Sequence, residues 1–183
     1  MTRIFDIIFS FFGLVILSPL FILLTFLGFV DTGYPFFFQE RLGKDKRKFK
    51  LIKFRSMRVN APSVATHLAN SSFITPYGSL LRKSKLDEIP QLWNVLEGSM
   101  SFVGPRPNLI NQTELIRMRD SLGVYSARPG ITGLAQISKI DMSSPMLLSE
   151  TDAKMIKEHN ILKYFKYILL TISGKGLGDG IVK

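Results

Sequence analysis

Three kinds of hydrophobic pattern follow one another along the chain. A continuous apolar run occupies Ile7 to Val30, and at the helical rise it is long enough to cross the hydrocarbon core of a bilayer. Stretches in which polar and apolar residues alternate then predict strands at Phe36 to Gln39 and at Lys48 to Arg55. Helical spacing dominates the remainder. The pattern therefore predicts a mostly helical α+β fold with a small soluble domain of short strands.

The apolar run is interrupted near its middle by Ser18-Pro19, where a kink is expected because proline removes one helical hydrogen bond. A kinked spanning helix and a re-entrant helix that returns to the same face both stay open. A cleaved signal peptide is disfavoured, because the apolar run is too long and no small-x-small site follows it. Arg3 precedes the run and a basic cluster at residues 41–48 follows it, so both ends look cytoplasmic.

The second predicted strand contains an irregularity. Leu51-Ile52 breaks the alternation, which suggests a bulge or two strand pieces that face differently, and either would re-aim Lys53 and Arg55. The segment from Val59 to Ser72 is small and polar and predicts a mobile loop, with His67 as a solvated residue.

Helix signals punctuate the middle of the chain. Thr75-Pro76 predicts a helix start with Thr75 as N-cap, and this helix should run to about Lys83. A second helix is expected from Glu88 to Leu96, with Asp87 as its N-cap and Gly98 ending it. The later predictions are a strand edge and rigid turn at Ser101 to Asn108, a helix from Leu109 to Leu122, and a loop from Ala127 to Gln136.

Apolar residues from Ile161 to Ile172 repeat at helical spacing, with Lys157, Lys163 and Lys166 elsewhere on the wheel. A core helix and an amphipathic helix lying at an anionic membrane surface both fit this pattern. The four glycines at 174, 176, 178 and 180 are not a nucleotide-binding fingerprint, because no strand precedes them and no helix follows.

Composition narrows the choice of partners. The 183 residues have room for one domain of ordinary size with appendages. We expect a membrane helix at residues 1–32, a catalytic domain at residues 33–160, and an interfacial helix and tail at residues 161–183. Lys and Arg (24) exceed Asp and Glu (14), giving a net charge of +10 that favours anionic partners. The absence of cysteine excludes disulfides, thiolate metal sites and cysteine nucleophiles.

Two adjacent acids, Asp87 and Glu88, are the candidate catalytic pair. Consecutive helical residues point about 100° apart, so they cannot flank one bond as glycosidase carboxylates do. A helix-capping role is the simpler reading. The neighbouring Arg82 and the proline-flanked Arg106 favour a phosphate site instead, in which Mg²⁺ bound by Asp87 and Glu88 would bridge to phosphate and Asp87 could attack phosphorus.

Three segments, "KFRSM" (53–57), "SKLDEIPQLWNVLEGSMSFVGPRP" (84–107) and "RPGITGLAQ" (128–136), closely resemble the bacterial sugar transferases. These are monotopic polyprenyl-phosphate phosphoglycosyl transferases, and this chain resembles their minimal catalytic form. The resemblance implies that Asp87 attacks the β-phosphate of a UDP-sugar, expels UMP and holds a covalent phosphosugar. Polyprenyl phosphate then displaces the aspartate, and this ping-pong route as a whole needs Mg²⁺. Glu88 matches the dyad partner.

The resemblance also assigns the remaining site residues. The basic residues that match phosphate-binding or carboxylate-binding positions are Lys53, Arg55, Arg82, Arg106 and Arg128. Ser18 and Pro19 match the break that makes the family's N-terminal helix re-entrant, and the C-terminal helix matches an interfacial one. The implied location is the cytoplasmic face of the bacterial inner membrane, in contact with phospholipid. A homodimer stays open.

One departure and two alternatives limit these expectations. Many relatives continue after "GLAQ" with Val-Asn-Gly-Arg, whereas this chain has Ile137 to Asp141, with Lys139 or Asp141 as substitutes for the arginine. The resemblance therefore leaves the identity of the sugar open. The alternatives are a glycosyltransferase that releases UDP and a non-enzymatic anchored protein that binds anions. No nucleic-acid partner is expected, because the basic stretch from Lys46 to Arg55 carries too few aromatic residues.

Overall fold

The computed structural model describes residues 2–62 and 70–175 of the chain. His67, part of the predicted loop around it, and Gly176, Gly178 and Gly180 lie outside the described residues. The helices (α), 3-10 turns (η) and strands (β) are α1 (Thr2–Ile16), α2 (Ser18–Thr32), β1 (Phe36–Leu42), η1 (Lys44–Lys46), β2 (Lys48–Phe54), η3 (Ser71–Phe73), α3 (Pro76–Ser84), η4 (Leu86–Glu88), α4 (Gln91–Glu97), β3 (Ser101–Val103), α5 (Thr113–Ser121), η5 (Val124–Ser126), β4 (Gly130–Thr132), α6 (Leu134–Ile137), α7 (Pro145–Lys157) and α8 (Ile161–Ile172). The mostly helical α+β class is confirmed.

The first two helices meet at the predicted break, with an angle of 64° between them. Pro19 has no amide proton to donate to the Val15 carbonyl four residues earlier, and the Ser18 hydroxyl donates to that carbonyl instead, at 2.7 Å. No single helix in residues 2–62 and 70–175 is long and apolar enough to cross a bilayer, whereas α1 and α2 together meet that criterion.

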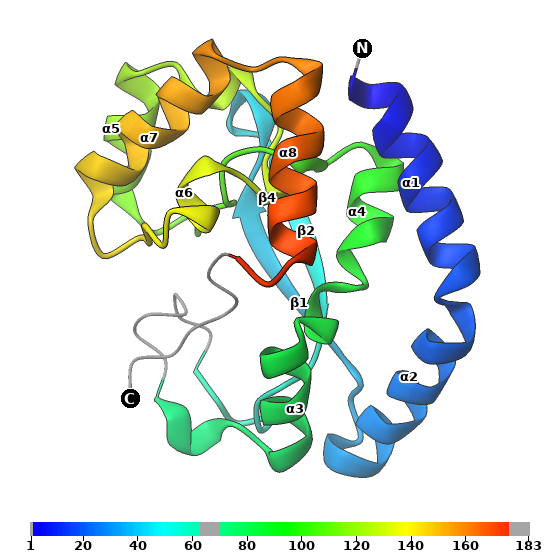
Figure 1. Cartoon of the computed structure of the whole chain (residues 1–183). Coiled ribbons are helices and arrows are strands. Elements are labelled where there is room, and N and C mark those ends of the chain that lie inside the picture. Colours follow the sequence, from blue (N-terminus) through cyan, green and yellow to red (C-terminus); the bar gives the residue numbers. More distant parts are fainter. Residues whose placement is uncertain (1, 63–69, 176–183) are drawn as a thin grey trace.

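Asp6, in the first half of α1, is a buried residue that joins three elements. Its Oδ1 atom accepts hydrogen bonds from the Ser101 hydroxyl (3.0 Å), the Phe102 amide (3.0 Å) and the Tyr164 hydroxyl (2.8 Å). Burial, together with the Asp6 carboxylate, raises the pKa of Tyr164, so the phenol remains a donor. The start of α1 is therefore fixed to β3 and α8, and Figure 1 shows α1 running beside α4.

The antiparallel hairpin of β1 and β2 is regular. Pairing runs one-to-one from Phe36 opposite Phe54 to Leu42 opposite Lys48, so the predicted bulge is wrong. The alternation only looked broken because both faces of β2 are covered near its end. Leu51 packs against α4 and β3, while Phe54 packs on the other face against α2 and α3.

The second sheet is a short parallel pair, β3 and β4, with Ser101 opposite Gly130 and Val103 opposite Thr132. The sequence predicted only a loop from Ala127 to Gln136, and that prediction is wrong, because the segment holds β4 and most of α6. Gly130 permits the pairing, since a Cβ atom there would lie 2.0 Å from the Gly104 nitrogen.

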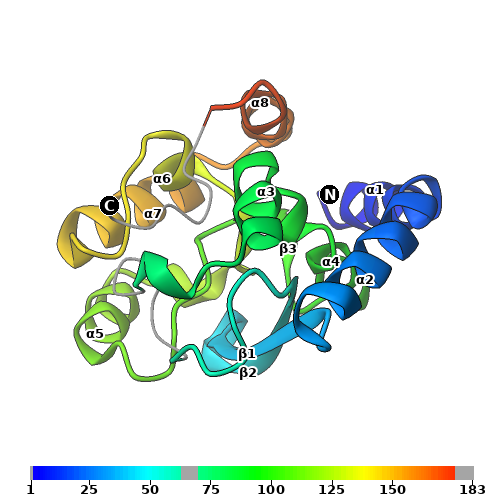
Figure 2. The ribbon, with the colours of Figure 1, turned by 90° about the horizontal axis from the view of Figure 1, so that it is seen from below.

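The chain after β3 is mostly helical and contains α5, α6, α7 and α8. Figure 2 shows α8 on one side of the molecule and the β1–β2 hairpin on the opposite side. α8 has the predicted bounds, and it buries Tyr164 and Tyr167 while Leu162 (78%) and Ile172 (77%) stay exposed. Lys157 belongs to α7, which the sequence did not predict, and α5 begins at Thr113, four residues later than expected.

Asn94 connects α4 to β2. The side chain is fully buried, its Oδ1 accepts from the Ile52 amide (3.0 Å), and its Nδ2 donates to the Lys50 carbonyl (2.9 Å). This amide therefore occupies the place of a neighbouring strand on the free edge of β2. Asn94 therefore joins α4, which follows Glu88, to β2, the strand that carries Lys53.

We predict that Asn94→Ala lowers the free energy of unfolding by roughly 2–4 kcal/mol, because it leaves two backbone groups without partners. Denaturant unfolding of the detergent-solubilised protein measures this. Asn111→Ala, at an exposed position, is the matched control and should change stability by no more than about 0.5 kcal/mol. Equal stability of the two variants would contradict the bridging role.

Candidate functional site

The two acids lie in a tight turn between α3 and α4, near the centre of the molecule (Figure 1). α3 ends at Ser84, and the following residue, Lys85, has a left-handed φ of 58° that separates α3 from the next turn, η4. Asp87 is buried within η4, whereas α4 has Pro90 at its N-cap position without a side-chain cap bond. The prediction that Asp87 caps α4 is therefore wrong, because η4 separates the acid from the helix.

Glu88 is the point where two cations meet. Its Oε1 atom lies 3.2 Å from Lys53 Nζ and 3.7 Å from Arg106 Nη2. Lys53 comes from β2 and Arg106 from the turn after β3, so three separate segments converge on one carboxylate. All three side chains are largely buried, so solvent and salt screen these pairs less than surface pairs.

Gln91, which the sequence analysis missed, faces the same small cavity as Lys53, Glu88 and Arg106. The sequence did contain a signal for Gln91, because it follows Glu88 by three residues and residues at this spacing lie side by side on a helix. Arg82 lies one turn before η4 and donates from Nε to the Ser56 hydroxyl at 2.8 Å. α3 approaches Ser56 closely because residue 78 is glycine, and a Cβ there would lie 1.9 Å from the Ser56 carbonyl oxygen.

Arg55 has its contacts elsewhere. Its Nε and Nη2 donate to the carbonyls of Tyr34 (3.1 Å) and Phe36 (3.3 Å), and its guanidinium lies 5.6 Å from the Phe37 ring centre. Burial lowers the pKa of Arg55, and the neighbouring Tyr34 opposes this. Arg55 therefore ties the end of β2 to the segment entering β1, and a substrate-binding role stays a prediction.

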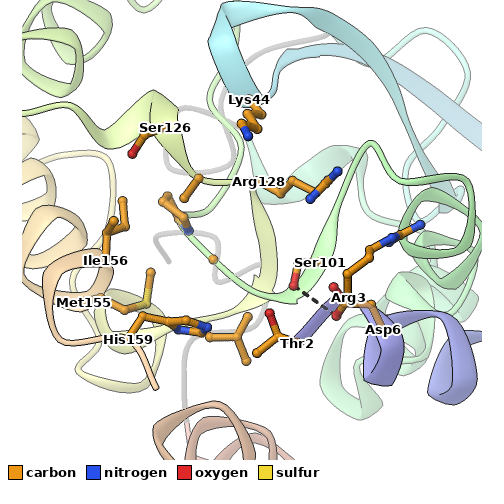
Figure 3. Close-up of a pocket in the computed structure, with 14 residues that line it drawn as sticks. Thr2, Arg3, Asp6, Lys44, Ser101, Ser126, Arg128, Met155, Ile156 and His159 are labelled. Carbon is orange, nitrogen blue, oxygen red and sulfur yellow. Dashed lines mark hydrogen bonds between the residues drawn. The ribbon is translucent and has the colours of Figure 1, made fainter. Parts of the chain in front are cut away.

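Arg128 lies at the opposite end of α4 from Glu88, in a cavity of about 230 Å³ (Figure 3). Its Nε donates to the Gly98 carbonyl at 2.9 Å, and Arg3 donates to the carbonyls of Val95 (2.6 Å) and Leu96 (2.8 Å). Two guanidinium groups thus cap the C-terminus of α4, where they also oppose the helix dipole. Binding of substrate by Arg128 likewise stays a prediction.

The segment that departs from the family pattern follows α6. Lys139 has a left-handed backbone (φ 58°), and the Asp141 carboxylate accepts bonds from the amide (2.8 Å) and hydroxyl (2.5 Å) of Ser143. These contacts give Asp141 a local turn-forming role.

The arrangement around η4 suits chemistry at phosphorus. A buried carboxylate, Asp87, adjoins a second carboxylate held by a lysine and an arginine. The cations can bind phosphate oxygens, and a desolvated carboxylate can act as a nucleophile or a ligand for a hard cation.

Comparison with known proteins gives a consistent family. The family model of bacterial sugar transferases matches residues 1–175. A UDP-galactose-lipid carrier transferase of Erwinia amylovora is 40% identical, with 74% of this chain and 32% of that protein covered. An undecaprenyl-phosphate galactose phosphotransferase of Salmonella typhimurium matches with the same identity and coverage. The exopolysaccharide production protein ExoY of Sinorhizobium fredii is 34% identical, with 97% of this chain and 86% of ExoY covered.

The chain spans about a third of the length of the Erwinia and Salmonella proteins, whereas its match to ExoY covers most of both chains. The family match includes the bent helix pair, the η4 turn and the turn that carries Arg106. The resemblance inferred from the sequence is thereby confirmed: the chain belongs to the bacterial sugar transferase family.

Proposed function

We propose that this chain is a phosphoglycosyl transferase that moves a sugar phosphate from a UDP-sugar to polyprenyl phosphate and releases UMP. The observation that carries the proposal is the buried Asp87 beside Glu88, whose carboxylate is held by Lys53 and Arg106. The names of the Erwinia and Salmonella relatives, which specify UDP-galactose and undecaprenyl phosphate, support this pair of substrates.

Asp87 is the nucleophile in this mechanism. One carboxylate oxygen bonds to the β-phosphorus of the donor, the bond from that phosphorus to the bridging oxygen breaks, and UMP leaves with the electron pair. An oxygen of polyprenyl phosphate then attacks the same phosphorus. The Asp87–phosphorus bond breaks, its electron pair returns to the carboxylate, and the product is a polyprenyl diphosphosugar.

The charges of the site indicate what the donor needs. Asp87 and Glu88 contribute two negative charges, and Lys53 and Arg106 contribute two positive charges, so these four side chains sum to zero. A diphosphate entering this site brings negative charge that the four side chains do not balance. Arg82, on the preceding turn, and a divalent cation are the groups that supply the difference.

Asp87 and Glu88 fit Mg²⁺, which typically binds through one or two carboxylates together with substrate phosphates. Across residues 2–62 and 70–175 no group of three or more His, Cys, Asp or Glu side chains forms an all-protein metal cage. This donor set therefore suits a cation shared with the substrate. When bound, Mg²⁺ neutralises the diphosphate and the leaving UMP.

The exposed apolar surface supports a position at a membrane. Apolar side chains are exposed along α1, α2 and α8, among them Ile16 (71%), Val30 (73%) and Leu162 (78%). Phe5 and Phe9 of α1 contact Phe165 of α8, with ring centres 5.2 and 6.1 Å apart, so this surface is continuous. We propose that α1 and α2 form a re-entrant pair at the cytoplasmic face of the inner membrane, with α8 at headgroup depth.

We predict that Asp87→Asn slows nucleotide release by at least about a thousand-fold, because an amide cannot replace the attacking carboxylate. The assay contains Mg²⁺, polyprenyl phosphate and UDP-galactose or UDP-glucose, and quantifies UMP and UDP separately. Asp45→Asn, at an exposed left-handed position that asparagine tolerates, is the control and should retain activity.

The nucleotide product separates the candidate activities. UMP supports transfer of the sugar phosphate, and UDP would refute it in favour of transfer of sugar alone. Binding of UDP-sugar without release of either nucleotide, by a protein shown to be folded, would refute the enzymatic role.

We further predict that replacing Ser18-Pro19 by Ala-Ala straightens the α1–α2 pair towards a spanning helix. Alanine at position 19 has an amide N–H that can donate a helical hydrogen bond to the Val15 carbonyl. Single cysteines at Thr2 and at Asp45, introduced into a chain that has no cysteine, report the side of the membrane by thiol labelling. Thr25→Ala, which also removes a hydroxyl bonded within α2, is the control. Cytoplasmic labelling of both sites in the Ala-Ala variant would contradict the expectation.

A further inference from the structure

The turn that carries Arg106 is held by hydrogen bonds to its backbone. All five backbone carbonyls from Gly104 to Asn108 accept hydrogen bonds from distant parts of the chain. For the carbonyls taken in order from Gly104 to Asn108, the donors are Gln136 Nε2 (3.3 Å), the Gly130 amide (2.9 Å), Arg119 Nη1 (2.8 Å), Arg41 Nη1 (2.9 Å) and the Leu42 amide (3.0 Å). Pro105 and Pro107 further restrict the backbone on either side of Arg106.

Arg119 of α5 provides the bond at Arg106 itself. This guanidinium is 1% exposed, and besides the Arg106 carbonyl its Nη1 also donates to Asn108 Oδ1 at 3.0 Å. Its Nη2 donates to Asp152 of α7 at 2.6 Å, and Asp152 is fully buried. Asn108 receives a second bond from the Tyr125 hydroxyl at 3.0 Å. A buried pair of charges therefore holds the backbone beneath Arg106.

We infer that Arg119, oriented by Asp152, is a positioning residue that places the Arg106 guanidinium against Glu88. The inference rests on the proposed function only in assigning Arg106 to the donor phosphates. Arg106 Nη2 lies 3.7 Å from Glu88 Oε1, and it reaches this position from a backbone that Arg119 and Arg41 bind at successive carbonyls. Through these bonds α5 and α7 set the geometry of the η4 site, although neither helix contributes a side chain to that site.

The action of Arg119 is geometric because its charge is balanced locally. Arg119 Nη2 lies 2.6 Å from Asp152 Oδ2, so the two opposite charges are paired between α5 and α7. The pair therefore adds little net electric field at Glu88. Removing one partner alone leaves an uncompensated buried charge and threatens folding, whereas replacing both by apolar residues of similar size is often tolerated. The informative variant is therefore Arg119→Met combined with Asp152→Leu.

The test is a double-mutant cycle on the rate of nucleotide release, whichever nucleotide is released. The paired replacement should slow the otherwise unchanged enzyme by about 100-fold, the loss expected from a displacement of about 1 Å at a catalytic group. In an Arg106→Ala background the same replacement should slow release by less than about two-fold, because its target is gone. Arg117→Met, an exposed arginine of the same helix, is the matched control and should leave the rate unchanged.

Equal slowing in both backgrounds would overturn the inference, since it would show a general effect on the fold. Hydrogen exchange provides an arm that needs no turnover. The amides of Leu42 and Gly130, which donate to the turn, should exchange faster in the paired variant, while the Ile52 amide bonded to Asn94 should not change. If the wild type releases no nucleotide, the proposed function fails while this exchange result still decides whether Arg119 fixes the turn.

Should the paired replacement not fold, Arg119→Lys provides the second variant. Its single ammonium keeps a charge beside Asp152 but lacks the planar fork that serves Asp152 and the Arg106 carbonyl together. The expected result is again a loss of rate that disappears in the Arg106→Ala background. Unchanged rates and unchanged exchange at Leu42 would overturn the positioning role.

Discussion

Three segments that are far apart in the sequence meet because one carboxylate accepts two cations. Glu88, just before α4, forms ion pairs with Lys53 of the hairpin and with Arg106 of the turn after β3. Two cations held this close together would repel each other without the carboxylate between them. The same arrangement leaves Asp87, the adjacent residue, buried beside groups that can bind phosphate. The rest of the fold keeps these three segments in register.

Buried polar side chains hold many of these elements in place. Asn94 attaches α4 to the edge of β2, Asp6 attaches the start of α1 to β3 and α8, and Arg119 attaches α5 and α7 to the turn of Arg106. Each of these links satisfies backbone or hydroxyl groups that would otherwise be buried without partners. Within residues 2–62 and 70–175, the buried apolar side chains are divided among four small clusters instead of one large core. Directional bonds therefore set the position of the site relative to the exposed apolar helices.

Local signals in the sequence predicted well wherever the structure depends on neighbouring residues. The N-cap at Thr75, the end of α4 at Gly98, the break at Ser18-Pro19 and the bounds of α8 are all confirmed. Predictions failed where a distant segment decides the outcome. The segment around Gly130 becomes a strand only because β3 lies beside it, and the alternation of β2 looks irregular only because helices cover both of its faces.

The candidate site follows the same division. The chemistry proposed for Asp87, Glu88 and Arg106 rests on residue types in a compact motif. The structure brings Arg106 and also Lys53 close to Glu88. The family resemblance grouped Arg55 and Arg128 with them, and in the structure each bonds to backbone carbonyls elsewhere. Arg119 and Asp152 carried no local signal, because a buried ion pair between two helices becomes visible only when the helices are packed.

The central claim is that Asp87 forms a covalent bond to phosphorus, and trapping that intermediate tests it most directly. The protein is incubated with Mg²⁺ and a donor that it turns over, without polyprenyl phosphate, then quenched and examined by intact-mass and peptide mass spectrometry. The account predicts an added sugar phosphate on the peptide that contains Asp87, which disappears when the acceptor is supplied. Turnover of the same donor with an unmodified Asp87, or with the adduct on another residue, would contradict it.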